Sequence, residues 1–262
     1  MPTQSGRTAH IAWYAHGESP EILLLHGFSD SAACWDPLIS FFTGRGGVLA
    51  TDAAGHGNSG LPTEPVADLS KTQAADMAAV LDDVDTGPVV VIGHSMGAST
   101  AAMLAHDRPD LVRALVLEDP PTGENAARHR PGVPDSFREL VALDLPARIA
   151  QGRLDNPTWP DDELPGWAVS KGQLNPRLFD RVGRVPHLLT DVLADVRCPI
   201  LLVHGDPDRG GLISAEFAAE CADKAAGPVT VVHIDGVGHS IRREARDRYL
   251  TSVGEFLGQI RQ

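Results

Sequence analysis

The chain is poor in cysteine, in basic residues and in long apolar runs. Its three cysteines are an odd number without metal-ligand spacing, which predicts free thiols in a reducing cytoplasm. Lysine and arginine number 22 against 35 acidic residues, and the net charge of −13 disfavours nucleic acid and anionic membranes as partners. No apolar stretch approaches the roughly 20 residues that span a bilayer. Residues 1–18 lack a signal-peptide pattern, so we expect a cytoplasmic protein.

The 262 residues are 42% hydrophobic and 22% charged, which is typical of a globular protein. Short apolar runs alternate with longer helical patterns, and this alternation predicts a mainly parallel sheet with helices on both faces. The expected strands are residues 8–15, 22–25, 47–51, 88–92, 111–117, 199–203 and 229–234. The expected helices are residues 70–84, 96–106, 214–225 and 242–260.

Residues 120–194 interrupt this rhythm, because they are rich in proline and contain no clear strand. A loop of this length without structure is improbable in a compact domain, so we expect short helices. The sequence therefore predicts a core domain from residues 1–119 and 195–262, with a helical cap inserted after the sixth strand. Trp159 and Trp167 in the cap, with Phe28 from the core domain, are candidates to line an apolar substrate pocket. Packing of the cap onto the core domain explains each of them equally well.

The pentapeptide GHSMG at 93–97 carries the strongest chemical signal. It lies between the expected strand 88–92 and an alanine-rich helix, which is the setting of a nucleophile elbow. The glycines on both sides of Ser95 permit the close passage of neighbouring chains that such a turn needs. We therefore predict that Ser95 is the nucleophile of a serine hydrolase.

The peptide HGFS at 26–29 follows the expected strand 22–25 and predicts an oxyanion hole. Such a site uses backbone N–H groups aimed at the negative charge that develops during the reaction. One donor is the residue after the nucleophile, Met96, and the other comes from this loop, with Phe28 as the best candidate.

A late histidine and an acid complete the candidate catalytic set. His239 lies in a glycine-containing loop between the last strand and the last helix, where it could take the proton of Ser95. Asp208 follows the strand 199–203 and is the preferred acid, since Asp206 is closer to the strand end and better placed to structure the turn. Glu118 and Asp119, at the end of the sixth strand, remain alternatives.

The chain order of nucleophile, acid and histidine is that of the α/β-hydrolases, and the whole chain resembles this superfamily. The matching segments are HGF at 26–28, DAAGHGNS at 52–59, GHSMG at 93–97, GDPD at 205–208 and GH at 238–239. In this superfamily the second of these segments is a structural signature.

The resemblance implies an esterase or lactonase that acts on a small, partly apolar molecule. A carbon–carbon bond hydrolase or lyase, a perhydrolase and a ligand receptor that has the same fold remain alternatives. No metal site and no phosphate-binding or dinucleotide motif is apparent, so we expect neither metal nor cofactor. We expect a monomer or a homodimer with a small-molecule substrate.

Overall fold

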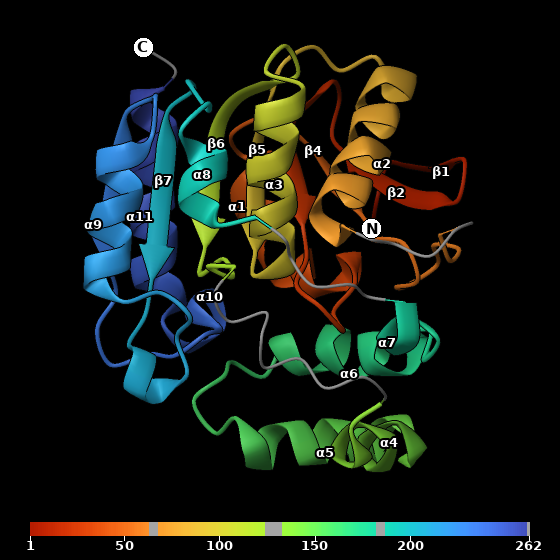
Figure 1. The fold of residues 1–262 in the computed structure, drawn as a ribbon. Helices are drawn as coiled ribbons and strands as arrows, with labels where there is room; N and C mark the ends of the chain where they lie inside the picture. The colour runs from red at the N-terminus through yellow and green to blue at the C-terminus, as the bar shows by residue number, and fades with distance from the viewer. Residues whose placement is uncertain (63–67, 124–132, 182–186, 261–262) are drawn as a thin grey trace.

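The computed structural model describes residues 1–62, 68–123, 133–181 and 187–260. Its strands form one eight-stranded sheet in the order β1-β2-β4-β3-β5-β6-β7-β8 (Figure 1). The strands are β1 (Gln4–Thr8), β2 (Ile11–His16), β3 (Pro20–Leu25), β4 (Gly47–Thr51), β5 (Val89–His94), β6 (Val112–Glu118), β7 (Ile200–His204) and β8 (Val229–His233). Pairing is antiparallel for β1–β2 and β2–β4 and parallel for the rest, which confirms the mainly parallel sheet.

Helices flank the sheet and alternate with its strands along the chain. They are η1 (Ala32–Leu38), α1 (Ile39–Thr43), α2 (Leu69–Val84), α3 (Met96–Asp107), α4 (Asp135–Ala142), α5 (Leu145–Asp155), α6 (Glu163–Gln173), α7 (Leu178–Arg181), α8 (Leu189–Leu193), η3 (Pro207–Arg209), α9 (Ala215–Lys224), α10 (Ile241–Glu244) and α11 (Arg246–Gln259). The first turn of α2 is capped by Asp68, whose carboxylate accepts from the N–H of Lys71.

Alternate side chains of the central strands serve two separate cores. Leu23 of β3 and Val91 of β5 pack on one face against α2, α3, α8 and α9. Leu24 of β3 and Ile92 of β5 pack on the other face against η1, α1, α10 and α11. Burial on both faces explains why these strands are nearly continuous runs of valine, isoleucine and leucine.

Two expected elements are each divided in the structure. Residues 8–15 were expected to form one strand, but Ala9 has a left-handed φ of +50° at a turn that separates β1 from β2. The expected helix 242–260 is broken at Ala245, where φ is −140° and ψ is 56°. Neither break is marked by a glycine or proline at the residue where it occurs, which is Ala9 in one case and Ala245 in the other.

The segment between β6 and β7 is helical where the structure describes it. Helices α4, α5, α6 and α7 gather beyond the carboxyl ends of the parallel strands (Figure 1). Gly166 lets α6 approach η1, because a Cβ atom there would lie 2.5 Å from the carbonyl oxygen of Ala33. Helix α8 was expected in the cap, but Leu189 and Leu193 join the core formed around α3.

All three cysteines are unpaired, as predicted. In the part of the chain that the structure describes, no helix is both long and apolar enough to cross a membrane.

Candidate active site

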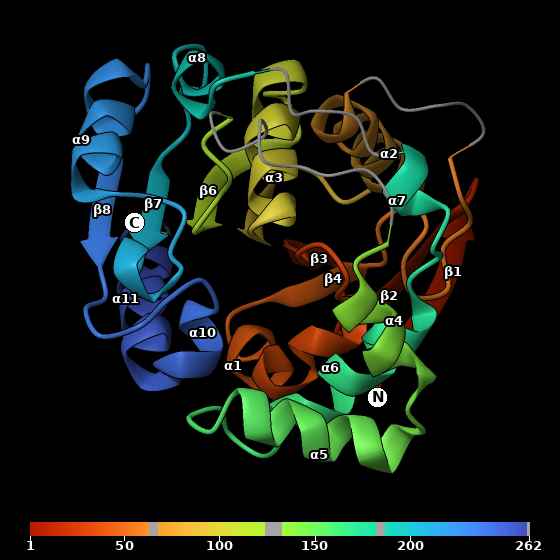
Figure 2. The ribbon, with the colours of Figure 1, turned by 60° about the horizontal axis from the view of Figure 1, so that its bottom comes forward.

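The loops that carry the candidate residues leave the sheet at one edge. In the parallel ladder Leu25 at the end of β3 pairs with Gly93, and His94 at the end of β5 pairs with Glu118. Glu118 in turn pairs with Val203 of β7. Figure 2 shows these strand ends together with α10 and the helices α4 to α6. The arrangement matches the rule that open α/β sheets place their sites at the carboxyl ends of the strands.

Ser95 lies at a strained turn between β5 and α3, as the pentapeptide predicts. Its φ of 53° and ψ of −117° are unusual for a residue other than glycine. The N–H of Ser95 donates to the carbonyl oxygen of Glu118 at 2.8 Å, which holds the turn against β6. Gly97 is needed because a Cβ atom there would lie 2.3 Å from the carbonyl oxygen of Leu25. The strain is therefore fixed by contacts with both neighbouring strands.

The loop after β3 passes directly over Ser95. A Cβ atom at Gly27 would lie 2.7 Å from Nδ1 of His94 and 3.3 Å from Cβ of Ser95. Phe28 follows and packs in one apolar cluster with Met96. Among the residues that the structure describes, neither the N–H of Phe28 nor that of Met96 has a hydrogen-bond acceptor. The first N–H groups of a helix have no partner within it, so the donor at Met96 is available to a ligand.

His239 is paired with Asp119. Its Nδ1 lies 2.6 Å from Oδ2 of Asp119, which has no exposed surface. The same carboxylate accepts from the N–H of Leu212 at 2.9 Å and from that of Ile213 at 3.3 Å. The contact assigns the proton to Nδ1 and leaves Nε2 free as an acceptor.

The preference for Asp208 as the partner of His239 is therefore wrong. Asp208 lies in η3 and is exposed, because the chain leaves the sheet after β7 in a short turn before it returns to Asp119. Asp206 is occupied elsewhere: its carboxylate accepts from His233 at 2.6 Å and from the N–H of Gly236 at 2.7 Å. The β7 loop supplies two backbone donors to Asp119 and does not supply the acid.

Glu118, the other alternative, faces away from His239. It is fully buried and accepts from the backbone N–H of Arg242 at 2.8 Å and from its Nη1 at 3.2 Å. Burial raises the pKa of Glu118, against the lowering effect of the Arg242 charge. Since Arg242 lies in α10 three residues after His239, Glu118 anchors the end of the loop that carries His239.

His94 is a further residue of the site that the sequence did not reveal. Its Nε2 lies 3.1 Å from the carbonyl oxygen of His239, and the two rings are 4.8 Å apart. Burial, with Arg242 and His239 nearby, lowers the pKa of His94 well below its ordinary value. A neutral His94 thus donates from Nε2 and holds the backbone of His239. The position inside GHSMG was a signal that it would lie near Ser95.

The candidate pocket residues have different surroundings. Trp159 and Trp167 pack edge to face at 6.2 Å in a small core with Leu164. The guanidinium of Arg243 covers the Trp159 ring at 4.7 Å. This packing supports the structural explanation for both tryptophans.

Phe28 contacts the helical segment between β6 and β7 instead. Its ring lies 5.3 Å from that of Phe179, and both belong to an apolar cluster with Leu174 and Leu178. Of the three pocket candidates, it is Phe28 that lies beside Ser95.

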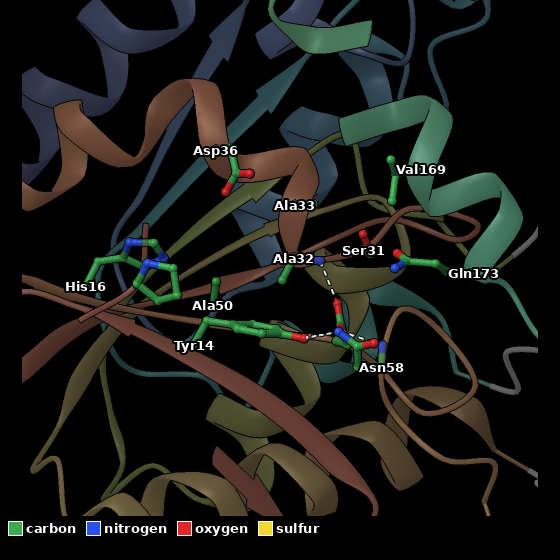
Figure 3. A pocket seen from close by; sticks show the side chains of 12 residues that line it. Tyr14, His16, Ser31, Ala32, Ala33, Asp36, Ala50, Asn58, Val169 and Gln173 are labelled. Carbon is green, nitrogen blue, oxygen red and sulfur yellow. Dashed lines mark hydrogen bonds between the residues drawn. The ribbon is translucent and has the colours of Figure 1, made fainter. Parts of the chain in front are cut away.

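A separate pocket of about 240 Å³ lies between η1, α6 and strands β2 and β4 (Figure 3). The Tyr14 hydroxyl there donates to Asp52 at 2.9 Å and accepts from Asn58 at 2.7 Å. Asp52 also accepts from the N–H of Ala32 at 2.8 Å. The segment 52–59 therefore ties η1 to the sheet, in keeping with the structural role expected of it. Among the described residues, no group of three or more potential ligands could hold a metal ion.

Comparison with known proteins gives a consistent result. A model of the "Alpha/beta hydrolase family" matches residues 22–251. The (E)-2-((N-methylformamido)methylene)succinate hydrolase of Acinetobacter baylyi is 26% identical over 98% of this chain and 97% of its own. Lipase LipV of Mycobacterium tuberculosis is 33% identical over 60% of this chain and 58% of its own. The N-formylmaleamic acid deformylase of Pseudomonas putida S16 superposes with a TM-score of 0.76 at 23% identity, over 95% of this chain and 99% of that one.

Proposed function

Because the chain belongs to the alpha/beta hydrolase family, we propose that it is a serine hydrolase that cleaves an ester or lactone through an acyl-enzyme. The observation that carries the proposal is the 2.6 Å contact between His239 and the buried Asp119, beside a serine held in a strained elbow. An imidazole oriented in this way is the general base that a serine needs to become a nucleophile.

In the proposed reaction, Oγ of Ser95 attacks the carbonyl carbon of the substrate while Nε2 of His239 takes its proton. The N–H groups of Phe28 and Met96 stabilise the negative oxygen of the tetrahedral intermediate. His239 then returns the proton to the leaving alkoxide, and the acyl group stays on Ser95. Water, deprotonated by the same imidazole, releases the acid and restores the serine.

The resting geometry is compatible with this sequence of steps. Among the described residues, Ser95 and His239 share no hydrogen bond, and the side chain of His239 is 33% exposed. In ligand-free enzymes catalytic hydrogen bonds are often long and shorten when substrate binds. Asp119, by contrast, is fully buried and held by backbone donors, so the imidazole already has its orienting partner.

To identify the acyl substrate, the assay needs a panel of compounds that includes the type of substrate for which a relative is named. Phe28, Phe179 and Leu174 form an apolar cluster beside the elbow, which favours a partly apolar acyl or alcohol group. The Acinetobacter relative is named for a substrate with a formamido group. The panel should therefore contain p-nitrophenyl esters of increasing chain length, γ-lactones, and an N-acylaminomethylene succinate.

The test compares wild type with Ser95→Ala and with Ser99→Ala. Ser99 lies one turn further along α3, is nearly buried, and its hydroxyl has no partner among the described residues, so it is a matched control. We expect multiple turnover of at least one panel member, its loss in Ser95→Ala, and its retention in Ser99→Ala. A fluorophosphonate should add its mass to the peptide that contains Ser95. Equal rates in wild type and Ser95→Ala on every substrate would refute the proposal.

A further inference from the structure

A lysine of the cap is buried against the loop that lies over Ser95. Lys171 on α6 has a side chain only 7% exposed, and a lysine is almost never buried in a protein unless it is paired. Its Nζ donates to the carbonyl oxygen of Ser29 at 3.0 Å, to the Ser29 hydroxyl at 3.0 Å and to Oδ1 of Asp30 at 2.7 Å. These three acceptors satisfy all three donors of the ammonium group.

The acceptors belong to a tight turn that contains the proposed oxyanion donor. The N–H of Asp30 donates to the carbonyl oxygen of Gly27 at 3.1 Å, and this bond closes a four-residue turn. Phe28 is the second residue of the turn and Ser29 the third, with a φ of +63°. A positive φ at the third position is normally left to glycine or asparagine. Ser29 therefore needs external support to keep this conformation, and Lys171 contacts both its backbone and its side chain.

Asp30 connects the same turn to α10, the helix that follows the loop of His239. Its Oδ2 accepts from Nη2 of Arg243 at 3.0 Å, and Nε of Arg243 contacts Glu163 of α6 at 3.3 Å. Burial raises the pKa of Asp30, but the charges of Arg243, Lys171 and Arg242 outweigh it and hold the pKa well below its ordinary value. The Asp30 carboxylate thus bonds to Lys171 of α6 and to Arg243 of α10, and it connects both helices to the turn.

We propose that Lys171 is a positioning residue for acyl transfer, which holds the turn 27–30 from the cap so that the N–H of Phe28 faces the reacting oxygen. The inference rests on the proposed serine hydrolase function. It implies that α6 is part of the catalytic framework. A purely structural lysine would fasten the cap without affecting the stabilisation of the oxyanion.

The test uses Lys171→Met with a trifluoromethyl ketone as the probe. Ser95 Oγ adds to the carbonyl carbon of this probe, the proton passes to His239, and the negative oxygen occupies the oxyanion hole. Loss of a whole oxyanion donor costs about 10²–10³ in kcat, so a displaced donor should cost about 10- to 100-fold. We expect kcat to fall by this factor, KM to change by less than about threefold, and the Ki of the ketone to rise in parallel with the loss in kcat/KM.

Arg148→Met is the matched control for cap stability. Among the residues that the structure describes, the guanidinium of Arg148 donates only to carbonyl oxygens within the cap, among them that of Ala168 at 2.7 Å, and makes no hydrogen bond to the turn. It should lower the melting temperature without the selective loss in kcat and ketone affinity. If Lys171→Met fails to fold, Lys171→Gln, which retains a donor, should be tested in its place. It should likewise lower kcat while KM changes little.

Ser29→Gly combined with Lys171→Met provides the decisive variant, because glycine adopts a positive φ without support. The double variant should regain at least about fivefold of the kcat lost by Lys171→Met. Absence of rescue, or a Lys171→Met enzyme with wild-type kcat and Ki, would overturn the inference. If wild type itself turns over nothing that Ser95→Ala does not, the proposed function fails instead.

Discussion

The neighbouring strands β6 and β7 both lead into acidic residues at the same edge of the sheet, but the two pairs have opposite surroundings. Glu118, the last residue of β6, and Asp119, which follows it, have no exposed surface and are bonded to Arg242 and His239, respectively. Asp206 and Asp208, which follow β7, lie in a turn open to solvent, and the Asp206 carboxylate bonds to His233. Of the two strand ends, that of β6 is bonded to Ser95, whose N–H donates to the carbonyl oxygen of Glu118.

The course of the main chain after each strand explains the difference. After β6, Asp119 takes a left-handed φ of +43°, which keeps its side chain at the sheet edge. After β7, η3 carries Asp208 outward, and the chain returns only at Leu212 and Ile213, whose N–H groups point at Asp119. Position at a strand end is therefore insufficient to identify a catalytic acid. The two sites differ in burial, and the Asp119 carboxylate accepts from two backbone N–H groups where that of Asp206 accepts from one.

The largest expected effect comes from Asp119→Asn. The amide would stabilise the wrong tautomer of His239 and could not support its positive charge, so kcat should fall by about 10⁴-fold. Steady-state kinetics on the best panel substrate would measure this loss. Asp208→Asn is the matched control and should retain kcat within about twofold. A large loss of kcat in Asp208→Asn, with kcat retained in Asp119→Asn, would support Asp208 as the acid, as predicted from the sequence.

The second effect is on stability and comes from Glu118→Gln. Removal of one partner leaves the buried Arg242 with Asp30, at 3.5 Å, as its remaining carboxylate among the described residues, so the free energy of unfolding should fall by about 3 kcal/mol, the lower end of the range for a broken buried pair. Urea unfolding followed by circular dichroism would measure it. Replacement of both partners in Glu118→Gln/Arg242→Met should cost less than the single change. A double variant less stable than the single one would argue against a paired charge.

The third effect is the pH dependence of stability, for which a buried histidine is compared with an exposed one. His56, which contacts the loop after β3, is fully buried, whereas His233 at the end of β8 is exposed. Burial lowers the pKa of His56 from 6.5 to about 3. Between about pH 3 and 6.5 the unfolded chain therefore binds a proton that the native state does not bind. The free energy of unfolding should fall as the pH drops from about 6.5 to 3.

Each such proton contributes a slope of about 1.4 kcal/mol per pH unit. Urea midpoints at several pH values should show a shallower slope in His56→Gln than in wild type. Equal slopes in the two proteins would show that His56 does not carry the dependence.

The sequence predicts the fold and the positions of Ser95 and His239 because short-range patterns determine them. Runs of valine and isoleucine mark strands buried on both faces, and GHSMG marks a turn that only small residues permit. The partner of His239 depends on contacts 120 residues apart, between Asp119 and the histidine loop. The same applies to the contact between Lys171 and Asp30, which are 141 residues apart. No local pattern distinguishes a buried lysine on a helix such as α6 from a solvated one.

The smallest effect is expected from Asp206→Asn. The carboxylate bonds to His233 and to the N–H of Gly236, at the start of the loop that leads to His239. An asparagine oxygen can still accept one of these bonds, and both contacts are exposed, so kcat should stay within about twofold and the melting temperature should change by about 2 °C or less. A loss of tenfold or more in kcat at unchanged melting temperature would mean that Gly236 transmits its position to His239. The β7 end would then help to orient the imidazole even though it supplies no acid, and the contrast between the two strand ends would be one of degree.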